Sequence, residues 1–132
     1  MNNKIIIKYS DENTDASIIY DLMDIEKDVY KKEDRGEYDN IERRFARNKE
    51  MFILLYDNDK LIGSLCYFPI SKDLHDKIMS ADDFYDDNIE AKDVVSFSNE
   101  NYIYLISIAL YKKYQGKCLG KMMMDAFFKK LR

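Results

Sequence analysis

The chain has 132 residues, of which 46% are hydrophobic, so it is long enough to bury the core of one ordinary domain. Its formal net charge of -4 argues against nucleic-acid binding, which depends on Lys and Arg side chains that neutralise phosphates. The apolar run at residues 5–7 is too short for a signal peptide or a membrane span. We therefore expect a single cytoplasmic domain over residues 1–132, with neither a nucleic-acid nor a membrane partner.

The first strand and helix are predicted before residue 30. Residues 4–9 alternate β-branched and polar side chains, a pattern typical of a strand. Thr14 or Asp15 is a suitable N-cap for the helix that follows. Apolar side chains then recur at helical spacing, and the predicted inward face is Ile18, Leu22, Ile25 and Val29. An amphipathic helix that packs against a sheet is expected.

A second, shorter helix is predicted over residues 40–48, after a charged stretch that ends the first. Ile41 and Phe45 have the spacing of an inward face. The arginines of this segment are expected on its solvated face, and they are Arg43, Arg44 and Arg47.

A β-hairpin is predicted over residues 51–68, because two apolar runs flank the reversal Asp57-Asn58-Asp59. Residues 71–80 are predicted to form a short helix that carries His75. The acidic segment at 81–93 has little periodicity and is predicted to be an exposed connector. Cys66 and Cys118 have no metal-type spacing with His75, so we interpret both cysteines as free thiols and expect no metal site.

The most informative segment joins a predicted strand at residues 102–110 to a closing helix at 119–131. The inward face of this helix is predicted to be Leu119, Met123, Phe127 and Leu131. The free N–H groups and the dipole at a helix N-terminus favour an anion. The lysines of an otherwise acidic chain also gather here, at positions Lys112, Lys113, Lys117 and Lys121. The junction is therefore a candidate site for a ligand with several phosphates.

This junction resembles the GNAT superfamily of N-acetyltransferases, whose signature after the fourth strand is Gln or Arg, two residues, Gly, one residue, then Gly or Ala. Gln115, Cys118 and Gly120 occupy those positions, with Cys118 where the family usually has glycine. The upstream order of elements also agrees, including a hairpin with Gly63 on its second arm. The resemblance implies an α+β (α/β) fold of the GNAT-like acyl-CoA N-acyltransferase type, with a mixed, mostly antiparallel sheet flanked by helices.

The resemblance also implies acetyl-CoA as co-substrate. The backbone of the fourth strand would pair with the pantetheine arm, and the loop amides would hold the pyrophosphate. The implied cofactor-binding residues are Ile108, Ala109, Leu110, Gln115, Gly116, Lys117, Cys118, Leu119, Gly120 and Lys121. A backbone N–H near Leu110 would polarise the thioester carbonyl while a neutral amine, on a small molecule or a peptide, attacks it directly.

The general base is not identified by this resemblance. Many members of the family carry a carboxylate in the fourth strand, but this chain has Ile106 at the usual place and no acid over residues 102–110. Glu100, which precedes the strand, and the polar residues Tyr104 and Ser107 within it are candidates for a water relay.

A full GNAT domain continues past this helix with another strand, a helix that often supplies a tyrosine acid, and a closing hairpin. We therefore expect the chain to be truncated after its third main helix. Three explanations are open: a fragment of a longer protein, a missing strand supplied by a partner subunit, or a domain that no longer catalyses. Three function classes also stay open: an N-acetyltransferase, a CoA-binding or regulatory module without turnover, and an interaction domain that forms a homodimer through an exposed strand edge.

Overall fold

The computed structural model describes residues 4–35, 37–80, 94–95 and 102–131. Four strands form one sheet in the order β1-β2-β3-β4, and every neighbouring pair is antiparallel. The strands are β1 (Ile5–Tyr9), β2 (Phe52–Asp57), β3 (Lys60–Ile70) and β4 (Tyr102–Leu110). The helices are α1 (Ile18–Val29), α2 (Tyr38–Arg47), α3 (Lys72–Ser80) and α4 (Leu119–Lys130), with short 3-10 turns at η1 (Lys32–Asp34) and η4 (Lys112–Tyr114).

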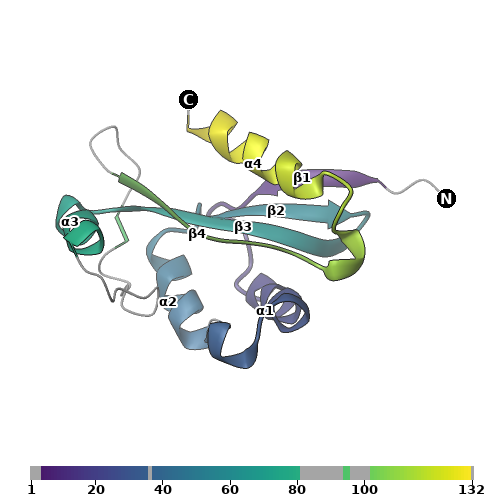
Figure 1. Cartoon of the computed structure of the whole chain (residues 1–132), viewed down its shortest axis with the longest axis horizontal. Helices are drawn as coiled ribbons and strands as arrows, with labels where there is room; N and C mark the ends of the chain where they lie inside the picture. Colours follow the sequence, from purple (N-terminus) through teal and green to yellow (C-terminus); the bar gives the residue numbers. More distant parts are fainter. Residues whose placement is uncertain (1–3, 36, 81–93, 96–101, 132) are drawn as a thin grey trace.

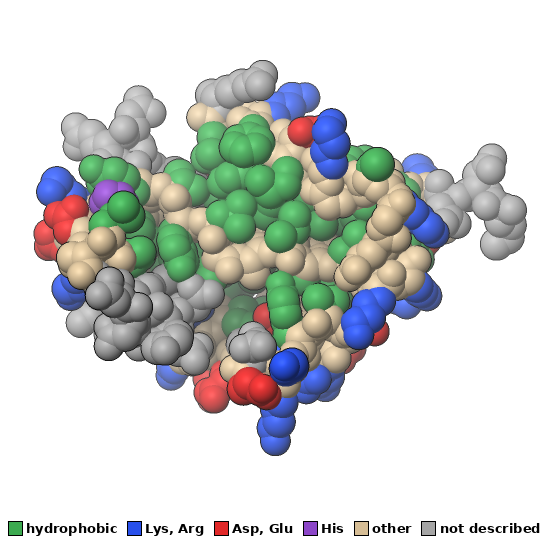
Figure 2. Space-filling view, in the orientation of Figure 1, with side chains coloured by type: hydrophobic (Ala, Val, Ile, Leu, Met, Phe, Trp, Pro, Cys, Tyr) green, Lys and Arg blue, Asp and Glu red, His purple; other side chains and the backbone are tan. Residues whose placement is uncertain are grey.

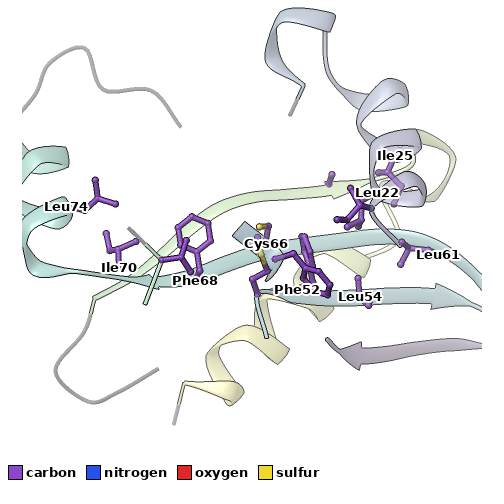
Figure 3. Close-up of a cluster of buried hydrophobic side chains, with 14 residues drawn as sticks. Leu22, Ile25, Phe52, Leu54, Leu61, Cys66, Phe68, Ile70 and Leu74 are labelled. Atoms are coloured by element: carbon purple, nitrogen blue, oxygen red, sulfur yellow. The ribbon is translucent and has the colours of Figure 1, made fainter. Parts of the chain in front are cut away.

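Helices cover both faces of the sheet, so the core has two layers. Figure 1 shows α1 and α2 on one face and α4 on the other. Side chains alternate along a strand, so neighbouring residues of β2 enter different layers: Phe52 packs toward α1 and α2, and Ile53 packs toward α4. Figure 3 shows Leu22 and Ile25 of α1, which belong to the first of these layers. Because both of its faces are covered, β3 is buried continuously over residues 61–70.

Helix α1 confirms the predicted amphipathic helix but begins later than expected. Ser17 occupies the N-cap position, and the Asp15 carboxylate accepts the Ser17 N–H at 2.8 Å. The buried residues of the helix are Ile19, Leu22 and Ile25. Ile18 and Val29, which were predicted to face inward, are only partly buried at the border of the core.

Helix α2 confirms the second helix, and Phe45 is buried as predicted, with Ile41 partly buried. The expectation that all three arginines are solvated is wrong for Arg44, whose residue is only 7% exposed. The reason is helical geometry. Arg44 lies three positions after Ile41 and beside Phe45, so it shares their inward-facing side of the helix.

The hairpin, the short helix α3, strand β4 and helix α4 all form where they were predicted. The hairpin reverses at Asn58, which has a positive φ of 56°. Met123 and Phe127 of α4 are buried, whereas Leu131 follows the end of the helix and is 43% exposed. The predicted connector at 81–93 lies outside the described residues.

Candidate functional site

Strand β4 lies at the edge of the sheet in the described part of the chain, and part of its backbone faces outward. The Tyr111 N–H donates to the Ile62 carbonyl at 3.1 Å. Hydrogen-bonded and non-hydrogen-bonded pairs alternate in an antiparallel ladder, and Leu110 is opposite Gly63 while Ile108 is opposite Leu65. The backbone N–H and C=O groups of Leu110 and Ile108 therefore point away from β3.

Two side chains reach the outward carbonyls of this edge. The Tyr30 hydroxyl, at the end of α1, donates to the Ile108 carbonyl at 3.0 Å. The Gln115 side-chain amide donates to the Leu110 carbonyl at 3.0 Å. These contacts agree with the orientation deduced from the ladder, and they tie the side chain of the exposed signature residue Gln115 to the strand.

A β-bulge interrupts the pairing of β4 just before this edge. Ser107 is opposite Cys66, but Leu105 is opposite Tyr67, so Ile106 is the extra residue on β4. A bulge bends a strand and increases its twist, and it leaves one residue out of the ladder. The bulge thus falls at Ile106, the position at which the resemblance to the GNAT superfamily implies a carboxylate in many members.

The loop between β4 and α4 reverses by means of two left-handed residues. Gly116 has a φ of 80°, and Cys118, the N-cap residue of α4, has a φ of 62°. The first amides of α4 belong to Leu119, Gly120 and Lys121, and they have no acceptor within the helix itself. Apart from the adjoining backbone of its own helix, a Cβ atom at Gly120 would meet no heavy atom within 4 Å, so the space beside Gly120 is open.

The lysines of the loop differ in their surroundings. The ammonium groups of Lys113 and Lys117 lie over the Tyr114 ring, at 5.4 and 5.6 Å from its centroid. The Tyr114 hydroxyl donates to the Asp57 carboxylate, and this hydrogen bond raises the pKa of Tyr114. Lys121 is 3.3 Å from Asp125 on its own helix. The positive charge of the loop is therefore concentrated around Tyr114.

Gly63 allows β3, β4 and α4 to approach closely. A Cβ atom at this position would lie 2.9 Å from Cδ1 of Leu110 and 3.1 Å from the Ala109 carbonyl oxygen. Met123 of α4 would also be only 3.3 Å away. The glycine noted in the sequence thus sets the position of the strand that carries the outward edge.

The last turn of α1 belongs to this site, although no sequence pattern indicated it. Besides the Tyr30 contact, the Asp28 carboxylate accepts the backbone N–H of Lys112 at 2.7 Å. Burial raises the pKa of the half-buried Tyr30 hydroxyl above its usual value, so it stays protonated and able to donate at neutral pH. From helical periodicity alone, Asp28 and Tyr30 would be interpreted only as the end of an amphipathic helix.

Two of the three candidates for the general base, Tyr104 and Ser107, lie on β4 in the described part of the chain. Glu100 lies outside the described residues. Tyr104 packs on the α1 and α2 side of the sheet, where its ring is 6.1 Å from that of Phe68. Ser107 is paired opposite Cys66 just after the bulge. Their role in proton transfer stays a prediction.

No metal-binding group of three or more His, Cys, Asp or Glu side chains occurs in the described part of the chain. Both cysteines are free there, with Cys66 buried and Cys118 exposed. Over the same residues, no helix combines the length and the apolar character that a membrane crossing requires.

The fold and the strand–loop–helix junction define a family. Residues 19–132 match the model of the acetyltransferase (GNAT) family, and the chain therefore belongs to this family. Its members are typically acyl-CoA-dependent N-acetyltransferases. No curated protein matches the sequence.

A solved structure supports the same fold. The chain is similar to the loading GNATL domain of CurA from Lyngbya majuscula, with a TM-score of 0.75 and 15% sequence identity. The similarity covers 97% of this chain and 58% of that chain. The chain thus spans little more than half the length of this structural relative.

Proposed function

We propose that the chain binds acetyl-CoA at the junction of β4 and α4 and transfers the acetyl group to a primary amine by direct attack. The observation that carries this proposal is the continuity of two backbone features. The outward edge at Ile108 and Leu110 leads, through a short loop, to the open N-terminus of α4 at Gly120.

The pantetheine arm of CoA contains two amides, so it can hydrogen-bond to a strand edge in the way an added strand does. In our proposal it pairs with the outward N–H and C=O groups of Ile108 and Leu110. Ala109, which points its backbone toward β3 in the ladder, contributes only its position between them.

The pyrophosphate of CoA would lie at the first turn of α4. The amides of Leu119, Gly120 and Lys121 are not used by the helix, and the helix dipole adds partial positive charge at this end. The left-handed residues Gly116 and Cys118 reverse the chain in the loop just before α4 begins. Lys117 adds charge beside Tyr114.

The chemical step requires a fixed donor for the thioester oxygen and a way to remove a proton from the amine. An outward backbone N–H of β4, near Leu110, would stabilise the negative charge that develops on this oxygen. Glu100, Tyr104 or Ser107 would relay the amine proton through water. As the amide C–N bond forms, the C–S bond of the thioester breaks, and CoA leaves as a thiolate that takes up a proton. The acceptor is a small-molecule or a peptide amine in this proposal.

The test is a calorimetric titration of acetyl-CoA into the wild-type chain and into Gly120→Leu. We expect the leucine to weaken binding at least tenfold, because its side chain fills the space that the phosphates would take. It should leave the fold intact, since apart from the adjoining backbone of the helix no atom lies within 4 Å of a Cβ at the position. Lys129→Leu, which adds the same side chain at the far, exposed end of α4, is the matched control. Unchanged affinity in Gly120→Leu would contradict the proposed phosphate site.

A second candidate function is a CoA-binding module without turnover. The observation that favours it is the bulged Ile106 at the place where relatives carry a carboxylate. Thiol release from acetyl-CoA in the presence of a panel of primary amines separates the two functions. Release above the rate without amine identifies an acetyltransferase, and tight binding with no release for any amine identifies the module.

A further inference from the structure

The contact between Tyr30 and β4 lies directly in the path proposed for the pantetheine arm. The Tyr30 hydroxyl is 3.0 Å from the Ile108 carbonyl oxygen, and this oxygen faces away from β3. An amide N–H of a ligand that paired with the same carbonyl would place its nitrogen about 2.9 Å from it. The hydroxyl and the ligand nitrogen would therefore be two donors that compete for one carbonyl oxygen.

The side chains of Gln115 and Tyr30, which both contact this edge, connect it to different parts of the molecule. Gln115 is only five residues from Leu110, and it belongs to the loop that the ligand itself would contact. Tyr30 is 78 residues from Ile108 and comes from a different element. Of these two contacts, only that of Tyr30 connects the edge of β4 to α1.

Tyr30 is also held firmly within its own segment. Its backbone N–H closes α1 by donating to Glu26 at 2.7 Å. Its carbonyl accepts from the Arg35 guanidinium at 3.0 Å, and a second nitrogen of this group donates to Lys27 at 3.3 Å. The backbone of Tyr30 is thus tied to the segment that follows α1.

We propose that Tyr30 closes the cofactor edge of β4 in the free protein, and that CoA binds by displacing the Tyr30 hydroxyl from the Ile108 carbonyl. This inference rests on the proposed function, because the competing ligand is the arm of CoA. Displacement loosens the turn between α1 and α2, around residues 30–35. Cofactor binding and loosening of this turn are therefore coupled, so that each of them favours the other.

The test compares CoA binding to the wild-type chain and to Tyr30→Phe by calorimetry. The phenylalanine keeps the ring and removes the hydrogen bond that CoA must otherwise break. We expect CoA to bind about two- to tenfold more tightly to the variant, the range that one ordinary hydrogen bond produces. Tyr20→Phe, on the exposed part of the same helix, is the control and should leave the affinity unchanged.

A second ligand separates the arm from the phosphates. Adenosine 3′,5′-bisphosphate carries phosphates but lacks the pantetheine arm, so it should bind equally to wild type and to Tyr30→Phe. Hydrogen exchange supplies an independent measurement. CoA should increase amide exchange over residues 30–35 of the wild type, whereas this exchange should already be high in the variant and change little.

The outcomes distinguish this inference from the proposed function. If folded Tyr30→Phe binds CoA with unchanged or weaker affinity while the wild type binds it, the Tyr30 inference is wrong and the cofactor site stands. If neither protein binds CoA, the proposed function fails and the inference fails with it. Circular dichroism and thermal unfolding establish that the variant is folded.

Discussion

The properties of a single residue in this chain depend on its burial as well as on its residue type, and Tyr67 is an example. It lies on β3 with no exposed surface, and its ring meets that of Phe127 edge to face at a centroid distance of 5.0 Å. Burial raises the pKa of Tyr67 to about 12. Cys118, by contrast, is exposed at the surface of the loop.

The raised pKa of Tyr67 predicts a loss of stability in alkali. A tyrosine in the unfolded chain has a pKa of 10.0, whereas burial raises the pKa of Tyr67 in the folded chain to about 12. The stability that depends on neutral Tyr67 is therefore fully present below pH 10 and is lost as the pH rises toward 12. Its size is on the order of 1–2 kcal/mol.

The measurement is the thermal midpoint of the wild type and of Tyr67→Phe at pH 8 and pH 11.5. The variant keeps the ring contact with Phe127 but cannot ionise, so the wild type should lose more of its midpoint than the variant. The other tyrosines are common to both proteins and cancel in the comparison. Equal losses would show that Tyr67 does not ionise differently in the two states.

Among the elements, α4 carries the site at one end and covers the sheet along the rest of its length. Phe127 is 6% exposed and packs on β3, while Phe128, the next residue, is 53% exposed. The two neighbours differ because consecutive residues of a helix point about 100° apart. Helix position, rather than residue type, thus decides which aromatic side chain contributes to the core.

Alanine substitutions test this contrast. Phe127→Ala should reduce the free energy of unfolding by about 3–5 kcal/mol, because it removes a buried ring and leaves a cavity between α4 and Tyr67. Phe128→Ala should change it by less than about 0.5 kcal/mol. Urea denaturation followed by circular dichroism measures both values. Similar losses in the two variants would mean that α4 packs with a different face.

The element order was predictable because each segment carries its own periodicity, and helices and strands repeat their apolar residues at different spacings. The boundary of α1 and the burial of Arg44 were not. The α1 boundary depends on how the turn at Asp15 bonds locally, and the burial of Arg44 depends on which neighbours cover α2. Helical spacing places Arg44 on the same side of α2 as Ile41 and Phe45, but it does not tell how completely the neighbouring elements cover an arginine there.

At the scale of the whole molecule, β4 is the edge strand of the sheet among the described residues, and such an edge can pair with another chain. The nine residues of β4 include no charged side chain, and charges are one of the features that protect an edge strand from pairing with another chain. Figure 2 shows apolar side chains gathered between α4 and β4, with Lys and Arg mostly toward the periphery. Pairing between two such edges is the homodimer anticipated from the sequence, and it stays a proposal.

A charge on the edge tests this proposal. Tyr102, the first residue of β4, is 39% exposed. Tyr102→Lys should reduce self-association, and the effect should be greatest near pH 5.1, where the chain has no net charge to keep copies apart. Sedimentation velocity measures the associated fraction. Tyr20→Lys adds the same charge on α1, and an equal reduction in this control would show that net charge, rather than the edge, governs association.

By itself, the sequence determined the order of strands and helices, the hairpin and the place of the strand–loop–helix junction. These depend on local spacing and on turn residues, which lie close together in the chain. Only the tertiary structure decided that the bulge falls at Ile106 and that the backbone groups of Ile108 and Leu110 point away from β3. It also decided that the Tyr30 hydroxyl contacts the Ile108 carbonyl. Those features depend on register and on contacts between residues as far apart as 30 and 108, and no local pattern specifies such pairs.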